Sequence, residues 1–368
     1  MPDRKLIDRT RKILIIKLFA IGELLMATPL IASLKETFPE ASLHVLTGSY
    51  IKDVIKNNPH VDKVIAADEK DFLAHRAVPL SRLLLALRRE KYDMIFCLHR
   101  PFIMSLFTFL ARAPVRAGFE RGREGFLYTH RVKPNIPGRH QIEEYLDLLR
   151  ALGVEPSFTK KMLFLDEEAL ARKELIFREH GLEPGKKVVA LSPAGGNNLA
   201  AHRLGTDALV RRWPDEKYGR LAKLVIEKLG AKVLIVGGEA EKAAAGKIIE
   251  IAGPECIDLT GKTDILTASA VIKGADILVT NDSGPMHLAA SVGTFVIALF
   301  GPTDPNVAGP YCENSQVIRK GFLCSPCFSK DRFPPFNVDC PAWKCMEEID
   351  PAEVYREIEN HLKASCQP

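Results

Sequence analysis

The stretch ILVTNDSGPMHLAA, residues 277–290, predicts a buried strand, a short turn and a helix in direct succession. Its apolar run ends at Thr280, and Pro285 suits the first position of a helix because that position needs no hydrogen-bonded N–H. A strand that leads directly into a helix is the repeating element of parallel α/β sheets. This stretch therefore predicts an α/β protein.

Apolar runs of strand length alternate with helix-like segments along the rest of the chain, as parallel sheets require. The predicted strands cover residues 13–18, 42–48, 63–68, 93–99, 115–119, 187–196, 232–238, 256–261, 276–282 and 295–302. The predicted helices cover residues 29–38, 81–90, 140–153, 215–229, 239–252, 264–274 and 285–293. Because the series starts afresh near residue 187, we predict two doubly wound parallel sheets facing each other across a cleft.

The length of the chain agrees with two domains, since 368 residues exceed one ordinary hydrophobic core. The segment LFLDEEALARKELIFREHGLEPGKK (163–187) has a charged helical pattern followed by a Gly-containing turn and forms the bridge between the halves. We predict one domain over residues 1–165, a second over 166–349, and an amphipathic terminal helix within 350–368.

The loop after Thr280 has the chemistry of an anion site. Ligands of open α/β sheets bind outside the carboxyl ends of the strands. Gly284 lets the backbone approach a ligand closely, and a helix N-terminus offers N–H groups and a partial positive charge to a phosphate or diphosphate. Asp282 and His287 would line the site. An ordinary strand–helix connection with an Asx-type cap explains the same residues and remains an alternative.

The Gly-rich turns of the second half lack the dinucleotide-binding fingerprint. Neither AGGNN (194–198) nor GGEAEKAAAG (237–246) contains G-x-G-x-x-G at the end of a strand. A dinucleotide cofactor is therefore not indicated.

The charge distribution indicates an anionic partner. The net charge of +5 is too modest to point to nucleic acid by itself. Between Arg100 and His140, however, eight basic residues face two acids, Glu120 and Glu124. The segment favours a phosphorylated lipid, an acidic sugar or a polynucleotide, and a solvated face with acidic neighbours is the alternative. The basic residues are Arg100, Arg112, Arg116, Arg121, Arg123, Arg131, Lys133 and Arg139.

The stretch KILIIKLFAIGELLMATPL (12–30) admits two interpretations, a membrane-targeting segment or a buried strand followed by a loop. Lys17 and Glu23 interrupt the apolar run, Pro29 breaks it, and no small-residue cleavage site follows. The uninterrupted pieces are shorter than the roughly 20 apolar residues of a spanning helix. We therefore interpret it as a strand and predict a cytoplasmic protein, in agreement with cysteines such as Cys97 in strand-like contexts.

Four motifs carry a resemblance to a known family. NDSGPMHLAASVGTFVIALFGPTDP (281–305) and KILIIKLFAIGELLMATPLIASLKETFP (12–39) resemble the signatures of glycosyltransferase family 9, the ADP-heptose:lipopolysaccharide heptosyltransferases. RRWP (211–214) and VGGEAE (236–241) stand where the family has its other marks. The resemblance implies a GT-B enzyme of two Rossmann-like domains that inverts the anomeric carbon without a metal. The donor would bind the C-terminal domain and the acceptor the N-terminal one, to which the last helix would return.

The resemblance also implies roles for single residues. Glu23 stands where the family usually has an aspartate that acts as general base. We expect it in a loop before a helix that has Thr28 as its N-cap and Pro29 as its first residue. Arg211 stands where the family usually has a lysine on the donor phosphates, and we expect one of Arg211 and Arg212 to point to solvent. For Glu23 the alternative is an ordinary solvated loop acid.

The remaining predicted site residues complete the donor and acceptor sets, and the acceptor arginines come from the basic segment between Arg100 and His140. Lys17 would face an acceptor carboxylate or balance Glu23. The predicted donor-binding set is Gly195, Gly196, Arg212, Glu241, Thr263, Asp282, Ser283, Gly284 and His287. The predicted acceptor-binding set is Lys17, Arg116, Arg121 and Arg123.

Four cysteines near the C-terminus, in CSPC (324–327) and CPAWKC (340–345), have the spacing C-x2-C-x12-C-x4-C. Four thiolates satisfy tetrahedral zinc, so Cys324, Cys327, Cys340 and Cys345 form a candidate structural metal site. Reduced thiols packed in a loop, or a disulfide, are the alternatives. We expect no cofactor to be required for catalysis.

Together these features predict an inverting enzyme that moves heptose from ADP-heptose to the inner core of lipopolysaccharide. Its partners would be a nucleotide-sugar donor, an anionic lipopolysaccharide-core acceptor and, transiently, the inner membrane face; we expect a monomer that binds no nucleic acid. A GT-B sugar-nucleotide 2-epimerase is one alternative. A catalytically weak donor-binding relative is another, because both Glu23 and Arg211 depart from the family pattern.

Overall fold

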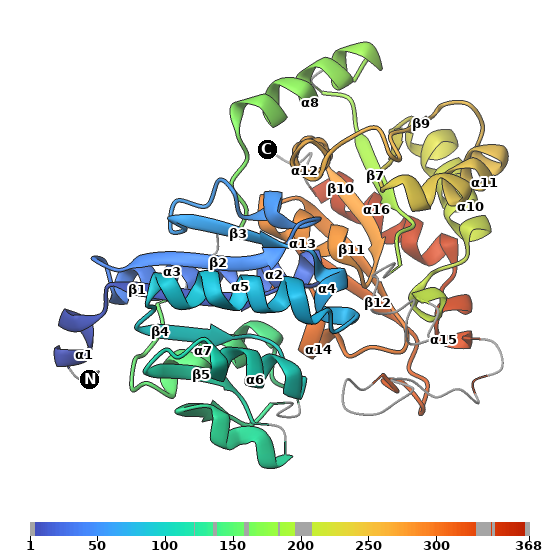
Figure 1. Ribbon diagram of the computed structural model, residues 1–368. Coiled ribbons are helices and arrows are strands. Elements are labelled where there is room, and N and C mark those ends of the chain that lie inside the picture. The colour runs from blue at the N-terminus through green and yellow to red at the C-terminus, as the bar shows by residue number, and fades with distance from the viewer. Residues whose placement is uncertain are drawn as a thin grey trace. The chain divides into compact units, whose positions relative to one another are not determined.

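The computed structural model describes residues 4–120, 122–134, 138–157, 162–182, 185–195, 208–328, 340 and 343–364. The chain divides into two compact units, Met1–Phe164 and Leu165–Pro368. Each unit is a parallel sheet covered by helices, as Figure 1 shows. The predicted α/β class with two parallel-sheet domains is confirmed.

The first unit has a six-stranded sheet in the order β3-β2-β1-β4-β5-β6, with every pairing parallel. This is the strand order of a Rossmann fold, and its order reverses between β1 and β4, where such sheets bind ligands. The strands are β1 (Lys12–Lys17), β2 (Ser42–Gly48), β3 (Lys63–Ala67), β4 (Met94–Cys97), β5 (Val115–Phe119) and β6 (His130–Val132).

Helices of the first unit pack on the sheet through alternate strand residues. Leu14 and Ile16 of β1 lie in one core with Leu87 of α5 and Phe107 of α6. Their neighbours Ile13 and Ile15 are buried and point to the opposite face of the sheet. The helices are α1 (Arg4–Arg9), α2 (Ile21–Met26), α3 (Thr28–Thr37), η1 (Lys52–Val54), α4 (Glu69–Leu73), α5 (Ala77–Glu90), α6 (Phe102–Leu110), η2 (Gly122–Leu127) and α7 (Gln141–Arg150).

The second unit repeats the topology. Its sheet has the order β12-β11-β10-β7-β8-β9, again wholly parallel, so the order reverses between β7 and β10. The strands are β7 (Val188–Ser192), β8 (Lys232–Ile235), β9 (Cys256–Asp258), β10 (Ile277–Asn281), β11 (Phe295–Phe300) and β12 (Ser315–Arg319).

The core of the second unit is built around Trp213 and Tyr218, whose rings meet edge to face at 4.9 Å. The last helix, α16, contributes Val354 and Ile358 to this core and packs on α10. The helices are α8 (Glu167–Glu179), η3 (Ala208–Arg211), α10 (Asp215–Leu229), η4 (Glu239–Glu241), α11 (Lys242–Ala252), α12 (Ile265–Gly274), α13 (Gly284–Val292), α14 (Pro305–Ala308), α15 (Lys344–Glu347) and α16 (Pro351–Ala364).

Several elements were not predicted from the sequence, among them β6, β12 and α6. The edge strands β6 and β12 are short and rich in polar residues, HRV and SQVIR, because an edge strand has only one neighbour to pack against. Helix α6, FIMSLFTFL, is apolar at every position except Ser105 and Thr108 and has no charged face. None of the helices in the described ranges is both long enough and apolar enough to cross a bilayer.

Candidate active site

Lys17 and Glu23 form an ion pair at the carboxyl end of β1, where the strand order of the first unit reverses. The Lys17 side chain is 2% exposed, whereas that of Glu23 is 28% exposed. A buried ammonium requires a compensating charge, and Glu23 supplies it while part of its carboxylate still faces solvent. The pair places a reactive carboxylate at the position where Rossmann sheets bind ligands.

The expectation that Glu23 lies in a loop is wrong. Glu23 lies in the first turn of α2, and α3 begins at Thr28 with Ala27, rather than Thr28, at its N-cap. The Thr28 hydroxyl donates to the Leu25 carbonyl at 2.7 Å, so the short helix α2 continues almost directly into α3. Ala20, with φ of 67°, turns the chain sharply enough for α2 to start there. The first turn of a helix favours a carboxylate electrostatically.

Three residues that the sequence analysis did not assign to the site surround this pair. His99 accepts a hydrogen bond from the Leu18 N–H through Nε2 at 2.8 Å, and the Tyr50 hydroxyl accepts one from the Ala20 N–H at 2.9 Å. Arg100 donates to Glu144 at 2.6 Å, and both side chains are largely buried. Burial raises the pKa of the Tyr50 hydroxyl, so it stays protonated at neutral pH.

The signal for His99 and Arg100 was present in the sequence, since His99 ends a predicted strand and Arg100 directly follows it. Only the strand order reveals that β4 lies next to β1 and brings its carboxyl end to the same point.

The structure does not bring Arg116 to this point. Arg116 is the second residue of β5 and pairs with Ile95, near the amino ends of the strands. Its guanidinium donates to the carbonyls of Leu127 and Ala113 at 2.9 and 2.6 Å, which fastens η2 to the sheet. Of the other predicted acceptor residues, Arg121 lies outside the described residues, and Arg123 lies in η2, where its side chain is not described.

The second unit places Asp282, Ser283 and helix α13 at the carboxyl end of β10, where the order of its sheet reverses. Helix α13 begins at Gly284, Ser283 makes no side-chain cap to it, and Pro285 occupies its first turn. The helix N-terminus therefore presents its positive end at the point where such sheets bind phosphates. His287 follows one turn later and is buried.

Arg211 reaches this end of the sheet from η3. Its Nη1 lies 3.2 Å from Oδ2 of Asp282, and its guanidinium lies 5.9 Å from the centroid of the Phe328 ring. A guanidinium held beside a helix N-terminus can bind a diphosphate through two parallel hydrogen bonds.

Arg212 is held by a different partner. Its Nη2 lies 3.6 Å from Oε1 of Glu241, and its stem crosses Gly195, where an added Cβ would lie 2.2 Å from Cγ of Arg212. The expectation that Arg211 or Arg212 points to solvent is wrong, because their side chains are only 22% and 18% exposed. Each guanidinium is drawn inward by its own carboxylate. Gly196 lies outside the described residues.

Glu241 closes the turn after β8. Its Oε2 accepts a hydrogen bond from the Gly238 N–H at 2.9 Å, and the side chain is almost fully buried. Thr263 lies between β9 and α12, directly before Asp264, which caps α12. In the described part of this unit, Nε of Arg212, Oγ of Ser192 and Oγ1 of Thr303 are buried without a hydrogen-bond partner. Buried polar atoms normally have partners, and Arg212 and Ser192 both lie in segments at the carboxyl end of the sheet.

Asn281 holds the loops of this site together. The side chain is fully buried; its amide donates to the carbonyls of Pro193 and Ala194 at 3.3 and 3.0 Å. Its oxygen accepts from the Trp213 N–H at 3.0 Å and from the Tyr218 hydroxyl at 3.1 Å. One residue thus ties the ends of β7 and β10 to the segment that carries Arg211.

Replacement of Asn281 by alanine is expected to lower the free energy of unfolding by about 3 kcal/mol, because several buried groups lose their partners together. Chemical denaturation followed by circular dichroism measures the effect. Asn314→Ala is the matched control, since Asn314 donates a single exposed hydrogen bond to Gly293, and its expected change is below about 0.5 kcal/mol. Equal losses in the two variants would contradict the role given to Asn281.

The four C-terminal cysteines lie in two segments, and both segments contact Gly301, which directly follows β11. The hydroxyl of Ser325, within CSPC, donates to the Gly301 carbonyl, and an added Cβ on Gly301 would lie 3.0 Å from Sγ of Cys345. Burial, and then the neighbouring thiolates of Cys340, Cys327 and Cys324, raise the pKa of Cys345 to about 11. Within the described ranges, no three His, Cys, Asp or Glu side chains are placed to hold a metal ion. The zinc site stays a prediction.

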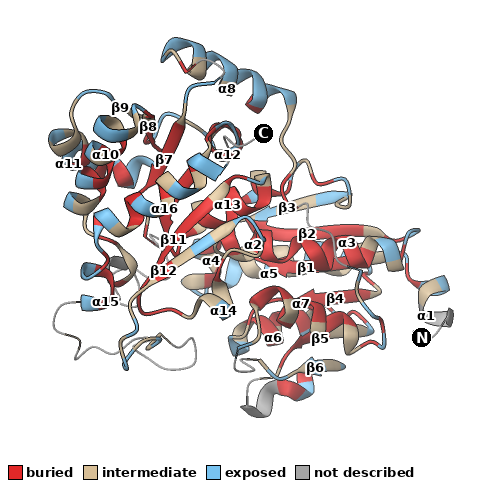
Figure 2. Ribbon diagram, turned by 180° about the vertical axis from the view of Figure 1, so that it is seen from behind, coloured by how far each residue is buried: buried red, intermediate tan, exposed pale blue. Residues whose placement is uncertain are grey.

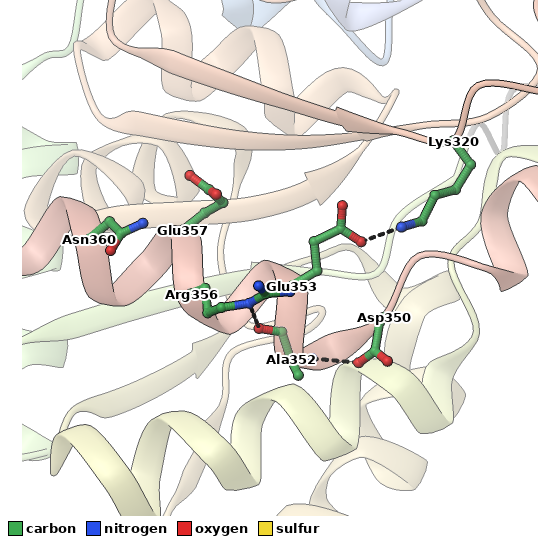
Figure 3. Close-up of a pocket in the computed structure, with 7 residues that line it drawn as sticks. All are labelled: Lys320, Asp350, Ala352, Glu353, Arg356, Glu357 and Asn360. Carbon is green, nitrogen blue, oxygen red and sulfur yellow. Dashed lines mark hydrogen bonds and ion pairs between the residues drawn. The ribbon is translucent and has the colours of Figure 1, made fainter.

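A surface pocket of the second unit lies along α16, as Figure 3 shows. Its lining has three carboxylates and two cations, and Lys320 pairs with Glu353 across it. Asp350 and Ala352 are joined by the hydrogen bond that starts the helix. The lining is therefore slightly acidic, and an anionic donor finds a more favourable site at the carboxyl end of β10. The lining residues are Lys320, Asp350, Ala352, Glu353, Arg356, Glu357 and Asn360.

Two Rossmann-type units, each with polar residues at the reversal of its strand order, are the architecture of the GT-B fold class. The model of glycosyltransferase family 9 (heptosyltransferase) matches residues 80–335. The chain belongs to this family, and the resemblance found in the sequence is confirmed.

Curated heptosyltransferases are similar in sequence to most of this chain. Lipopolysaccharide heptosyltransferase 2 of Salmonella typhimurium is 28% identical over 84% of this chain and 88% of its own length. Lipooligosaccharide heptosyltransferase 2 of Campylobacter jejuni is 27% identical over 94% and 96%.

Two solved structures show the same fold. The family 9 glycosyltransferase of Veillonella parvula superposes with a TM-score of 0.81 at 22% identity, covering 96% of this chain and 98% of its own. The E. coli ADP-heptose lipopolysaccharide heptosyltransferase II superposes with a TM-score of 0.74 at 22% identity, over 96% and 99%.

Proposed function

We propose that the protein transfers heptose from ADP-heptose to the inner core of lipopolysaccharide. Family membership and the names of the curated relatives support this activity. The observation that carries it is the combination of Arg211, Asp282 and the N-terminus of α13 at the strand-order reversal of the second unit. This combination suits the diphosphate of a nucleotide sugar.

The leaving diphosphate is stabilised by charges that the fold provides. As the bond from the sugar to the diphosphate breaks, negative charge grows on the leaving oxygen. The positive end of α13 and the Arg211 guanidinium are preorganised to stabilise such charge. Arg211 approaches from beside Asp282, so the phosphate competes with that carboxylate for the guanidinium. We propose that this arrangement removes the need for a catalytic metal.

The acceptor hydroxyl is activated in the first unit. Glu23 takes the proton of the attacking hydroxyl as general base, and the hydroxyl oxygen then bonds to the anomeric carbon as the diphosphate leaves. A single displacement of this kind inverts the anomeric configuration. Lys17 holds the Glu23 carboxylate in place through their ion pair. Arg100 and His99, which adjoin this end of β1, would contact the anionic groups of the acceptor.

The test is incubation of the purified protein with ADP-heptose and a heptose-deficient core acceptor, followed by mass spectrometry of the acceptor. A mass increase of one heptose, lost in Glu23→Ala, supports the proposal. Conversion of the sugar nucleotide to its 2-epimer without acceptor would identify an epimerase. Donor binding by calorimetry with no transfer would identify a catalytically weak relative. Either of these results overturns the proposed transfer activity.

The nature of the acceptor also bears on the cellular location of the protein. A lipopolysaccharide core is attached to lipid A, so we propose that the protein acts as a monomer on the cytoplasmic side and associates peripherally with the inner membrane face.

The four cysteines lead to a separate prediction about metal content. If Cys324, Cys327, Cys340 and Cys345 hold structural zinc, protein purified without chelator will contain about one zinc per chain. Elemental analysis measures it, and Cys340→Ser should lose the metal and lower the melting temperature, whereas Cys312→Ser should change neither. A zinc content far below one per chain, with all eight thiols titratable in the unfolded chain, would establish reduced thiols instead.

A further inference from the structure

The first unit exposes an unusual share of large apolar side chains on one helical layer. Nine large hydrophobic residues are exposed among the described residues, and five of them lie on α5, α6 and η2. Contiguous exposed apolar surface marks an interaction site in a globular protein. The five are Val78 (58% exposed), Leu85 (51%), Phe102 (52%), Phe109 (43%) and Phe126 (70%).

On α5 these residues form a stripe with arginines. Val78, Arg82, Leu85 and Arg89 are exposed and are spaced four, three and four residues apart, so they share one face of the helix. The opposite face, with Leu87 fully in the core, packs on the sheet. Basic and apolar side chains therefore alternate along the outer surface of the helix, while the inner face is fixed by the fold.

Helix α6 and η2 add an aromatic patch beside this stripe. Arg88 of α5 donates to the Leu110 carbonyl at the end of α6, which joins the two helices. The Arg116 guanidinium lies over the Phe109 ring at 5.4 Å and donates to the Leu127 carbonyl of η2. Phe109 is thus placed next to the segment that carries Phe126. These exposed residues lie on the outer surface of the layer, whereas the central strands of the sheet beneath it are buried, as the red colour of β1 and β4 in Figure 2 shows.

Most of the charges described on α5 and α6 are positive. Arg82, Arg89 and Arg112 are exposed, and α6 contains no charged residue. The acid at the end of α5, Glu90, is held by Lys12 and Lys63 at 2.8 Å each. Phenylalanine and leucine interleaved with arginine suit the boundary between headgroups and acyl chains, and each arginine adds attraction to anionic lipid.

We infer that the outer surface of α5, α6 and η2 docks the protein on an anionic lipid bilayer. This inference builds on the proposed function, which supplies a lipid-linked acceptor, but it concerns a surface formed by other residues than Lys17 and Glu23. The aromatic side chains would enter the headgroup boundary, and the arginines would meet lipid phosphates. The docked face would hold the unit at the membrane independently of sugar transfer.

The test is co-sedimentation of the full chain with vesicles of phosphatidylcholine and phosphatidylglycerol, with pure phosphatidylcholine vesicles as comparison. The wild type should bind the anionic vesicles and be released by salt. The double variant Phe109→Ser/Phe126→Ser should lower the partition coefficient by about tenfold or more. Arg82→Glu/Arg89→Glu should lower it by at least about tenfold as well. Leu175→Ser, an exposed leucine on α8 of the other unit, is the matched control and should bind as the wild type does.

Two further measurements separate this inference from folding and from catalysis. The melting temperature of the phenylalanine variant, and its transfer of heptose to a lipid-free core oligosaccharide, should equal those of the wild type. Unchanged vesicle binding in both double variants would overturn the inference. A second result would also overturn it: neither protein binds vesicles, and light scattering shows that the wild type is a dimer and the phenylalanine variant is a monomer. The face would then contact a second copy of the chain. Loss of transfer to the lipid-free acceptor by the wild type would overturn the proposed function alone.

Discussion

Substitution of Glu23 by glutamine is expected to lower kcat for heptose transfer by about a thousandfold, while the KM for ADP-heptose changes little. Glutamine keeps the size of the side chain but cannot accept the proton of the acceptor hydroxyl. The proton transfer to Glu23 takes place mainly in the transition state, so its loss lowers kcat more than it changes KM. Initial rates with a core acceptor, measured over a range of donor concentrations, give both constants.

Two companion variants sharpen this result. Glu23→Asp shortens the side chain by one methylene and restores the residue that the family pattern favours. A displacement of about 1 Å at a catalytic group costs on the order of a hundredfold, so Glu23→Asp reports whether α2 is positioned for the longer side chain. Glu40→Gln, at an exposed turn, is the matched control and should leave both constants unchanged. A loss of less than about tenfold in Glu23→Gln would remove Glu23 from the role of base.

Substitution of Arg211 by methionine is expected to lower kcat/KM by about two to three orders of magnitude, because one preorganised cation is lost from the leaving diphosphate. Calorimetric titration with ADP should show weaker binding as well, since the guanidinium contacts the phosphates in the ground state too. Arg211→Lys retains the charge but not the two-pronged geometry, so it should recover part of the loss.

Controls distinguish a role in donor binding from a role in stability. Removal of Arg211 leaves Asp282 without its ion pair, so the melting temperature of each variant is measured first. Arg220→Met removes an exposed arginine from α10 of the same unit and should retain full activity. Wild-type ADP affinity in Arg211→Met would place the phosphates elsewhere.

The site could be predicted from the sequence wherever one local motif contains its chemistry. The strand–turn–helix at 277–290 indicated an anion site because the strand end, the Gly-Pro helix start and the acidic residue are contiguous. Residues contributed by separate strands could not be found in that way. His99 joins Lys17 only because β4 pairs with β1, and a pairing between strands some eighty residues apart leaves no local pattern.

Predictions from short sequence motifs were wrong where a side chain has a partner that the motif does not include. Thr-Pro is a typical helix start, but the Thr28 hydroxyl is taken by the Leu25 carbonyl, and Glu23 consequently lies inside α2. Adjacent arginines usually divide between the interior and solvent. Here Asp282 and Glu241 come from distant segments and draw both arginines inward.

The sequence by itself determined the alternation of buried strands and helices, the two similar halves and the family. It could do so because apolar patterns and turn residues are formed by residues that are neighbours in the sequence. Only the tertiary structure decided which strand ends meet, that Arg116 fastens η2 instead of reaching the end of β1, and that α5, α6 and η2 expose phenylalanine and arginine on one surface. These features depend on strand order and on packing between segments that are distant in the sequence. No short stretch of sequence shows which distant segments will pack together.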